Sequence, residues 1–214
     1  MAPSVSISLS ILRRSTESRL EKLTKQYING MTTKPSKEHI TLIDDFVKNN
    51  KDIITKADVL YLGNINNSND SFRNLAKDVH HGTMHGTGLV WNSYWGFSNP
   101  SGTGYVDTNY NPSTQGINLT QNNAGLGIYH HTNVASSSVW SIGVYATNYL
   151  GLRLNTDSFA VNQAAVVNIS SVPFRAGLFG AFRTLSNAVN SKNQNLTNTT
   201  GTNTSTAIPN GNIH

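Results

Sequence analysis

Histidines are the side chains of this 214-residue sequence with the most obvious capacity for chemistry. His80, His81 and His85 lie close together, and His130 and His131 form a second group. Neutral imidazoles bind zinc, copper and nickel. On a strand, however, His81 and His85 would share one face while His80 points to the other, and no carboxylate or cysteine stands nearby to complete a ligand shell. We therefore expect no metal here, and polar strand positions or a mildly pH-responsive surface instead.

Carboxylates are too sparse for the usual hydrolytic sites. After His80 the only acidic residues are Asp107 and Asp157, whereas a glycosidase needs two carboxyl groups in one cleft. Asp107 stands in an Asp-Thr-Asn context, where a side-chain carboxylate usually bonds its own backbone. The sequence also contains no nucleophile elbow, phosphate-binding loop or dinucleotide fingerprint. These patterns predict a protein that is not an enzyme and has no cofactor.

Three aromatic residues, Trp91, Tyr94 and Trp95, are spaced closely enough to form one platform. Exposed aromatic rings stack on sugar rings, so this trio is a candidate glycan contact. The stronger expectation is that Trp91, Trp95 and Trp140 fill the core, as large apolar side chains usually do.

Charge is distributed unevenly along the chain. The formal net charge is +5, but 12 of the 16 basic and 9 of the 11 acidic residues lie at or before His80. The remainder is kept soluble by Asn, Thr, Ser and Gly, which is a poor electrostatic footprint for a phosphate backbone. We expect no nucleic-acid binding. No apolar run approaches the roughly 20 residues of a membrane span, so we expect no membrane insertion and, because Arg13 and Arg14 follow the apolar start, no signal peptide.

Helical periodicity is confined to the first 62 residues. One helix is expected to open at Ser15 and Thr16 and to end near Gly30, and a second to begin after Ser36. A third apolar stretch runs through residues 53–60. The apolar positions expected on the first two helices are Leu20, Leu23, Tyr27 and Met31, then Ile40, Ile43, Phe46 and Val47.

Beyond Gly63 the apolar period changes from three or four residues to two, as in strands. Several short alternating segments separated by Gly, Asn, Pro and Ser favour an antiparallel β-sandwich, with a jelly roll as the first choice. Residues 187–212 suit a hairpin, a loop or a tail, and Ile208 and Pro209 suggest the start of another strand. The predicted core-facing sets are Ala124, Leu126 and Ile128; Trp140, Ile142 and Val144; Leu150, Leu152 and Leu154; Ala165, Val167 and Ile169; and Leu178, Gly180 and Phe182.

Three stretches occur in an order that resembles a domain of tailed-phage virion proteins related to the laminin-G or concanavalin-like jelly roll. They are YVDTNYNPS at residues 105–113, GIYHHTN at 127–133 and GLFGAFRTLSN at 177–187. The resemblance covers residues 36–214 and implies a virion component of tail, baseplate or head fibre that works by assembly. The family usually has Ser-Arg where this chain has His130 and His131, so the role of that arginine is not carried over.

The resemblance also implies further strands and a terminal helix beyond His214, so the sandwich of residues 63–214 is expected to lack the last strands of the family. Either the sequence is a fragment of a longer protein or a partner subunit supplies the missing edge. We expect residues 1–62 to form a helical assembly region, with Leu20, Leu23 and Tyr27 as the anchor. A symmetric homo-oligomer, with a trimer favoured, and other virion proteins are the expected partners. The alternative function is a carbohydrate-binding receptor module of a tail fibre, with host surface glycan as its partner.

Overall fold

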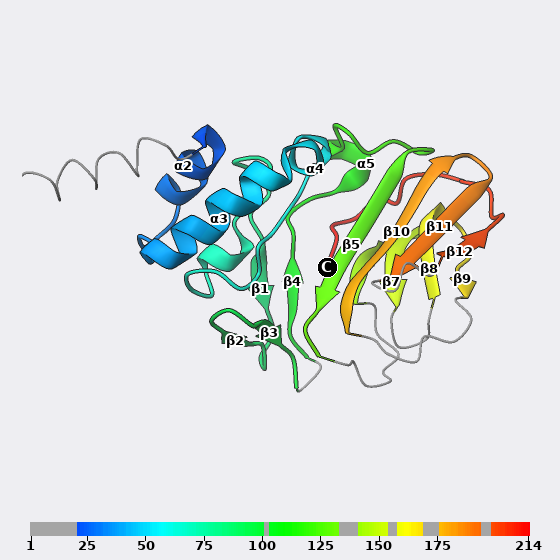
Figure 1. Cartoon of the computed structure of the whole chain (residues 1–214). Coiled ribbons are helices and arrows are strands. Elements are labelled where there is room, and N and C mark those ends of the chain that lie inside the picture. The colour runs from blue at the N-terminus through cyan, green and yellow to red at the C-terminus, as the bar shows by residue number, and fades with distance from the viewer. Residues whose placement is uncertain (1–20, 101–102, 133–140, 154–157, 169–175, 194–197) are drawn as a thin grey trace, which may run out of the picture. The chain divides into compact units, whose positions relative to one another are not determined.

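The computed structural model describes residues 21–100, 103–132, 141–153, 158–168, 176–193 and 198–214 (Figure 1). The chain divides into two compact units, the first comprising Met1–Val79 with Trp91–Phe97 and the second comprising His80–Val90 with Ser98–His214. Among the described residues strand outweighs helix, 33% against 20%, and the strands pair antiparallel. The expectation of a mainly β chain with a few helices is confirmed.

The first unit contains helices α2 (Lys22–Asn29), α3 (Lys37–Asn49) and α4 (Lys51–Lys56) and a 3-10 turn at Asp70–Phe72. Ser36 caps α3 as predicted, because its hydroxyl accepts the backbone N–H of His39 at 3.1 Å. α2 ends at Gly30, also as predicted, whereas the expected opening at Ser15 lies outside the described residues. None of the described helices is both long and apolar enough to cross a membrane. The apolar faces of these helices build one core of Tyr27, Ile43, Val47, Ile54, Ile65 and Leu75.

Twelve strands follow in the part of the chain that the structure describes. Two short pairs are β1 (Thr83–His85) with β4 (Tyr105–Asp107), and β2 (Val90–Asn92) with β3 (Gly96–Ser98). A short helix, α5 (Pro112–Gln115), precedes the longer strands. These longer strands are β5 (Ala124–His130), β6 (Ile142–Tyr145), β7 (Tyr149–Arg153), β8 (Ser158–Gln163), β9 (Val167–Asn168), β10 (Gly177–Leu185), β11 (Ala188–Asn193) and β12 (Asn198–Gly201).

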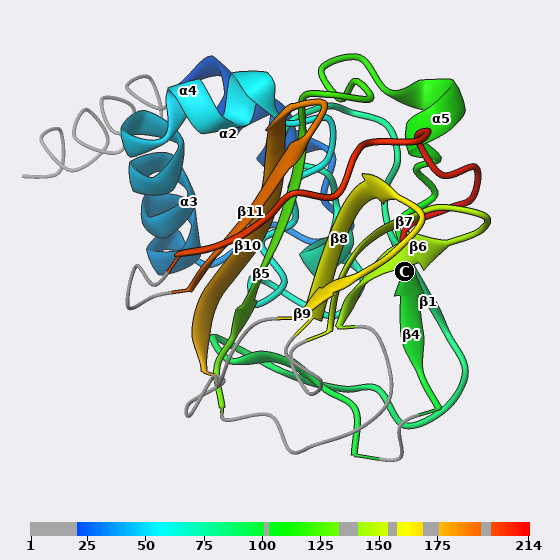
Figure 2. The ribbon, with the colours of Figure 1, turned by 90° about the vertical axis from the view of Figure 1, so that its right-hand side faces the viewer.

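The long strands form two four-stranded antiparallel sheets in the second unit. Sheet I has the order β12-β11-β10-β5 and sheet II has the order β6-β7-β8-β9. Strands β5, β10 and β11 of sheet I contact β7 and β8 of sheet II, and Figure 2 shows the two sheets as separate layers. At Gly143, where φ is +154°, a Cβ would lie 2.6 Å from the carbonyl oxygen of Leu150, so the close approach of β6 and β7 requires glycine.

Between the two sheets lies Arg183, whose side chain is fully buried. Its Nε donates to the carbonyl of Val161 at 2.8 Å, and one terminal nitrogen donates to Gln163 Oε1 at 2.6 Å. The same terminal nitrogen reaches the carbonyl of Asn203 at 2.8 Å, and the other reaches the carbonyls of Leu185 and Ser186 at 3.1 and 2.8 Å. Burial lowers the pKa of Arg183, yet a guanidinium stays charged at neutral pH, and its five N–H donors match these five neutral acceptors.

Several strand predictions are confirmed. Leu150 and Leu152 are buried on β7, and Ala124 is buried on β5 with Leu126 and Ile128 half-buried on the same face. β11 and β12 form the hairpin that was one alternative for the Asn-rich end of the chain. The predicted positions Trp140, Leu154 and Ile169 lie outside the described residues.

Other strand predictions are wrong. β10 buries Phe179, Ala181 and Arg183 and leaves Leu178 60% exposed, so the face predicted from Leu178, Gly180 and Phe182 is the outer one. Alternation places these residues on one face but does not say which face is buried, and here the core admits an arginine. Ala165 is exposed. No strand forms at Ile208 and Pro209, and β8 was missed because all six of its residues are buried, which removes the alternation.

The buried arginine leads to a stability prediction. Replacing Arg183 with Met removes five donors and leaves the two buried acceptors, the carbonyl of Val161 and Gln163 Oε1, without their partner. We expect the free energy of unfolding to fall by roughly 2–6 kcal/mol, because each buried acceptor left unsatisfied costs about 1–3 kcal/mol. Urea denaturation followed by circular dichroism measures it. Lys192→Met, at an exposed position on the adjacent strand β11, is the control and should change stability by less than about 0.5 kcal/mol.

Candidate functional site

The candidate glycan residues Trp91, Tyr94 and Trp95 lie together on the β2–β3 hairpin, in the part that belongs to the first unit. Trp95 is 62% exposed and Tyr94 is 44% exposed. Trp91 is half-buried, and its Nε1–H donates to the buried hydroxyl of Ser71 at 2.9 Å. The expectation that the three tryptophans fill the core is therefore wrong for Trp95, which lies on the surface. Trp91 is partly covered, and Trp140 lies outside the described residues.

Tyr94 has a backbone conformation that side chains rarely adopt, with φ at +65°. Asn64 fixes this conformation from both sides: its carbonyl accepts the Tyr94 N–H at 3.0 Å, and its side-chain amide donates to the Tyr94 carbonyl at 3.1 Å. Gly96, at φ +85°, closes the turn. A left-handed non-glycine residue costs of order 1–3 kcal/mol and persists where its surroundings over-determine it, a pattern concentrated at functional sites.

The side chain of Tyr94 is also fixed. Its ring packs on the buried imidazole of His39 with centroids 4.5 Å apart, and its hydroxyl donates to Glu38 Oε2 at 3.1 Å. The hydrogen bond to Glu38 raises the pKa of Tyr94, because it adds to the cost of forming a phenolate. The Nε2 atom of His39 has no hydrogen-bond partner within the described residues. The hairpin thus presents the fixed ring of Tyr94, bonded to a carboxylate, and the exposed indole of Trp95.

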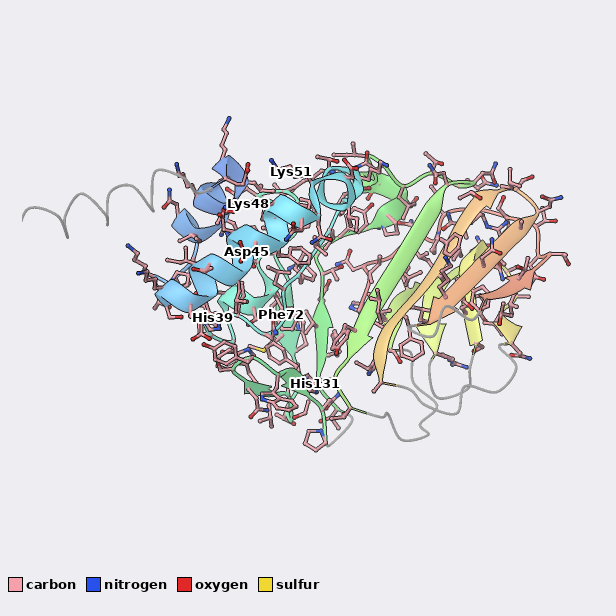
Figure 3. The ribbon with its side chains drawn as sticks, viewed as in Figure 1. His39, Asp45, Lys48, Lys51, Phe72 and His131 are labelled. Carbon is pink, nitrogen blue, oxygen red and sulfur yellow. The ribbon has the colours of Figure 1, made fainter. Side chains whose placement is uncertain are left out.

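A second set of aromatic rings connects strand β3 of the hairpin to other residues of the first unit. Phe72 and Phe97 stack with centroids 4.4 Å apart, and Tyr61 meets Phe72 edge-on at 5.9 Å. Figure 3 labels Phe72 next to the hairpin and His39 at the start of α3. This packing joins Phe97 of β3 to Phe72 and Tyr61 and so ties the hairpin to the rest of the first unit. His39, Glu38 and Asn64 were not predicted for this site, and their distance along the sequence from Tyr94 left no local signal.

A polar network organises the loop that carries Asn64. Asp70, which is 3% exposed, accepts the backbone N–H and the hydroxyl of Thr32 at 2.7 and 3.0 Å. The side-chain amides of Asn66 and Asn67 donate to it at 2.6 and 2.7 Å. Burial by itself would raise the pKa of Asp70, but these hydrogen bonds outweigh that effect and lower the pKa. The Asn-rich segment is therefore ordered by a buried carboxylate.

The histidines considered as metal ligands in the sequence lie in the second unit. His80 Nδ1 lies 2.8 Å from the carbonyl of Asn109, and His85 stacks on Tyr105 at 5.1 Å. His130 meets Phe179 edge-on, and burial lowers its pKa. In the part of the chain that the structure describes, no three His, Cys, Asp or Glu side chains are arranged to hold a metal ion. His131, labelled in Figure 3, lies edge-on to Tyr129 at 6.3 Å.

The remaining predicted residues are placed as follows. Asp107 accepts the backbone N–H of Asn109 at 2.7 Å, which confirms its expected turn role. Asp157 lies outside the described residues, as does Leu20 of the expected assembly anchor. Tyr27 is buried in the core of the first unit and Leu23 packs against that core, so both contribute to the fold of their own unit.

Comparisons with protein-family models, with curated proteins and with solved structures gave no match to this chain.

The network around Asp70 predicts an acid-dependent loss of stability. Because hydrogen bonds lower its folded-state pKa, its contribution is complete above the ordinary value of 3.8 and is lost as the pH falls through the lower folded-state value. We expect Asp70→Asn to lower the free energy of unfolding at pH 7 by roughly 2–4 kcal/mol, and the gap to the parent chain to narrow below pH 3.8. Denaturant titrations at several pH values measure this. Asp45→Asn, at an exposed carboxylate on α3 (Figure 3), should leave stability nearly unchanged.

Proposed function

We propose that this protein is a structural component of a bacteriophage particle, of tail, baseplate, head fibre or capsid decoration, and that it works by assembly rather than by chemistry. The three motifs shared with the phage virion domain support the proposal, as does the antiparallel, charge-poor second unit. On this view the chain is located in the virion, after assembly in the host bacterial cytoplasm, and its partners are other virion proteins and further copies of itself.

The observation that carries this proposal is an apolar patch on the outer face of sheet I. Tyr129 and Leu178 stand opposite each other on β5 and β10, and they are 66% and 60% exposed. Gly127 and Gly180 are the next opposed pair on the same face, and neither adds a side chain to it. A monomeric surface gains nothing by exposing a large aromatic and an aliphatic side chain together, whereas a subunit interface buries both.

We further propose that the two sheets form a β-sandwich. The chain leaves sheet I after β5, builds all of sheet II, and returns through β10 beside β5, so that a single core separates the layers. The jelly-roll or concanavalin-like type within that class rests on the resemblance of the three motifs alone.

The assembly proposal is tested in particles. Phage purified through a density gradient from a host that carries this gene should contain the chain at a fixed ratio to the major capsid protein. Tyr129→Ser with Leu178→Ser should reduce that ratio at least about tenfold, because the variant loses two buried apolar anchors of the interface. Ile117→Ser, at a 71% exposed position outside the patch, is the matched control. A chain that is absent from purified particles, or equal incorporation of all variants, would contradict the proposal.

A second function, a carbohydrate-binding receptor module, is favoured by the rigid and exposed Tyr94 and Trp95 beside Glu38. Aromatic faces stack on the apolar face of a pyranose ring, and a carboxylate accepts its hydroxyl groups. If this function holds, Trp95→Ala should weaken binding to host cells or arrayed glycans by about fivefold or more, since one lost aromatic stack is worth roughly 1 kcal/mol. Val79→Ala, at another exposed apolar position of the first unit, should bind as the parent does.

A further inference from the structure

Strand β5 is an edge strand of sheet I that lacks the usual protection against pairing with another chain. It pairs with β10 on one side, and among the described residues no strand pairs with its other side. Its seven residues, AGLGIYH, include no proline and no acidic residue, lysine or arginine. Natural sheets usually protect a long edge with such residues or with a bulge.

The other sheet edges are shorter or covered. β9 has two residues and β12 has four. On β6 the backbone of Gly143 exchanges two hydrogen bonds with that of His214, both at 2.9 Å. The open edge of β5 is therefore an exception within this unit, and it leaves a row of N–H and C=O groups directed away from β10.

The buried face of sheet I is also open at this edge. Ile128 and Leu126 stand opposite Phe179 and Ala181, which are 3% and 1% exposed, yet both β5 side chains are only half-buried. An additional strand with apolar side chains on the same face would cover them, as β10 is covered by its neighbours.

The chain itself contains a segment of this kind outside the described residues. Residues 4–11 read SVSISLSI, with serine at every even position and a β-branched or aliphatic residue at every odd one. This is the alternation of a strand with one apolar and one polar face. Eight residues extend about 26 Å and the seven of β5 about 23 Å, so the lengths match. Neither segment carries a formal charge that pairing would bury.

We propose that residues 4–11 of a second copy of this chain add to the free edge of β5 as an extra strand. Val5, Ile7, Leu9 and Ile11 then face the core beside Leu126 and Ile128, and the serines join the outer face that carries Tyr129. Backbone hydrogen bonds supply the affinity and the alternating side chains fix which face is buried, as in other cases of strand addition. The inference rests on the proposed assembly function and names the contact that joins copies of the chain.

Disulfide trapping tests the pairing directly, because the natural chain contains no cysteine. Full-length chains with Tyr129→Cys are co-expressed with full-length chains that carry one cysteine at Ser6, Ile7, Ser8 or Leu9, and mixed disulfides are read on non-reducing gels. Since Tyr129 lies on the outer face, the best serine position should cross-link at least about tenfold faster than Ile7→Cys or Leu9→Cys, whose side chains point to the other face.

The matched control is Leu178→Cys. Leu178 is as exposed as Tyr129 and stands opposite it on the same face, but it lies one strand further from the edge. Its distance to the added strand, about 9–10 Å, exceeds what a disulfide spans, so it should cross-link no faster than the apolar positions. Equal rates at serine and apolar positions, equal rates at Leu178, or no cross-link at all would overturn the proposal.

Amide hydrogen exchange of the full chain gives a second measurement that does not depend on engineered cysteines. With Ile7→Ser and Leu9→Ser together, the amides of β5 should exchange about tenfold faster than in the parent while those of β10 keep their rates. Unchanged exchange in β5 would count against the added strand. If the chain enters particles but forms no such cross-link, only the inference about the added strand is contradicted. If the chain cross-links but is absent from particles, only the virion assignment is contradicted.

Discussion

The second unit depends on one positive charge that it keeps out of water. Arg183 sits between the two sheets, and its guanidinium is satisfied by five neutral oxygens, none of them a carboxylate. Desolvating a cation costs several kcal/mol, which only a complete set of acceptors offsets. Because those acceptors come from β8, from the end of β10 with the turn after it, and from Asn203 beyond β12, the charge fixes the relative positions of three separate stretches of this unit. The second unit has few charged residues, yet the position of one of them determines how its strands are held together.

The same residue explains where prediction from sequence succeeded and where it failed. Alternation located β5, β7 and β10, and Ser36 marked the start of α3, because both signals are local. On β10, however, two faces compete, and the apolar count favours Leu178 and Phe182 over a face that ends in an arginine. The choice is made by acceptors about twenty residues away in sequence, which no local pattern contains. β8 has no alternation at all, since both of its faces are covered.

At the candidate site, too, prediction from sequence succeeded for local features and failed for features set by tertiary contacts. The spacing of Trp91, Tyr94 and Trp95 suggested a platform, and the structure places the three on one hairpin. Which rings are exposed follows from tertiary contacts: Trp91 turns toward Ser71, while Asn64 holds the backbone of Tyr94 in a left-handed conformation. Such a conformation is unfavourable for tyrosine on its own, so sequence alone gave no reason to expect it.

The open edge of β5 and the apolar patch beside it have a common physical consequence. A long strand without charge, next to an exposed Tyr129 and Leu178, would favour uncontrolled association unless a specific partner covers it. Proteins usually avoid that risk with lysine or proline at the edge, and this chain places most of its charge in the first unit instead. An edge that lacks such protection is consistent with one that is occupied in the working assembly. The low charge of the second unit would suit the proposed strand addition, because charges at such an interface would have to be desolvated each time a copy joins.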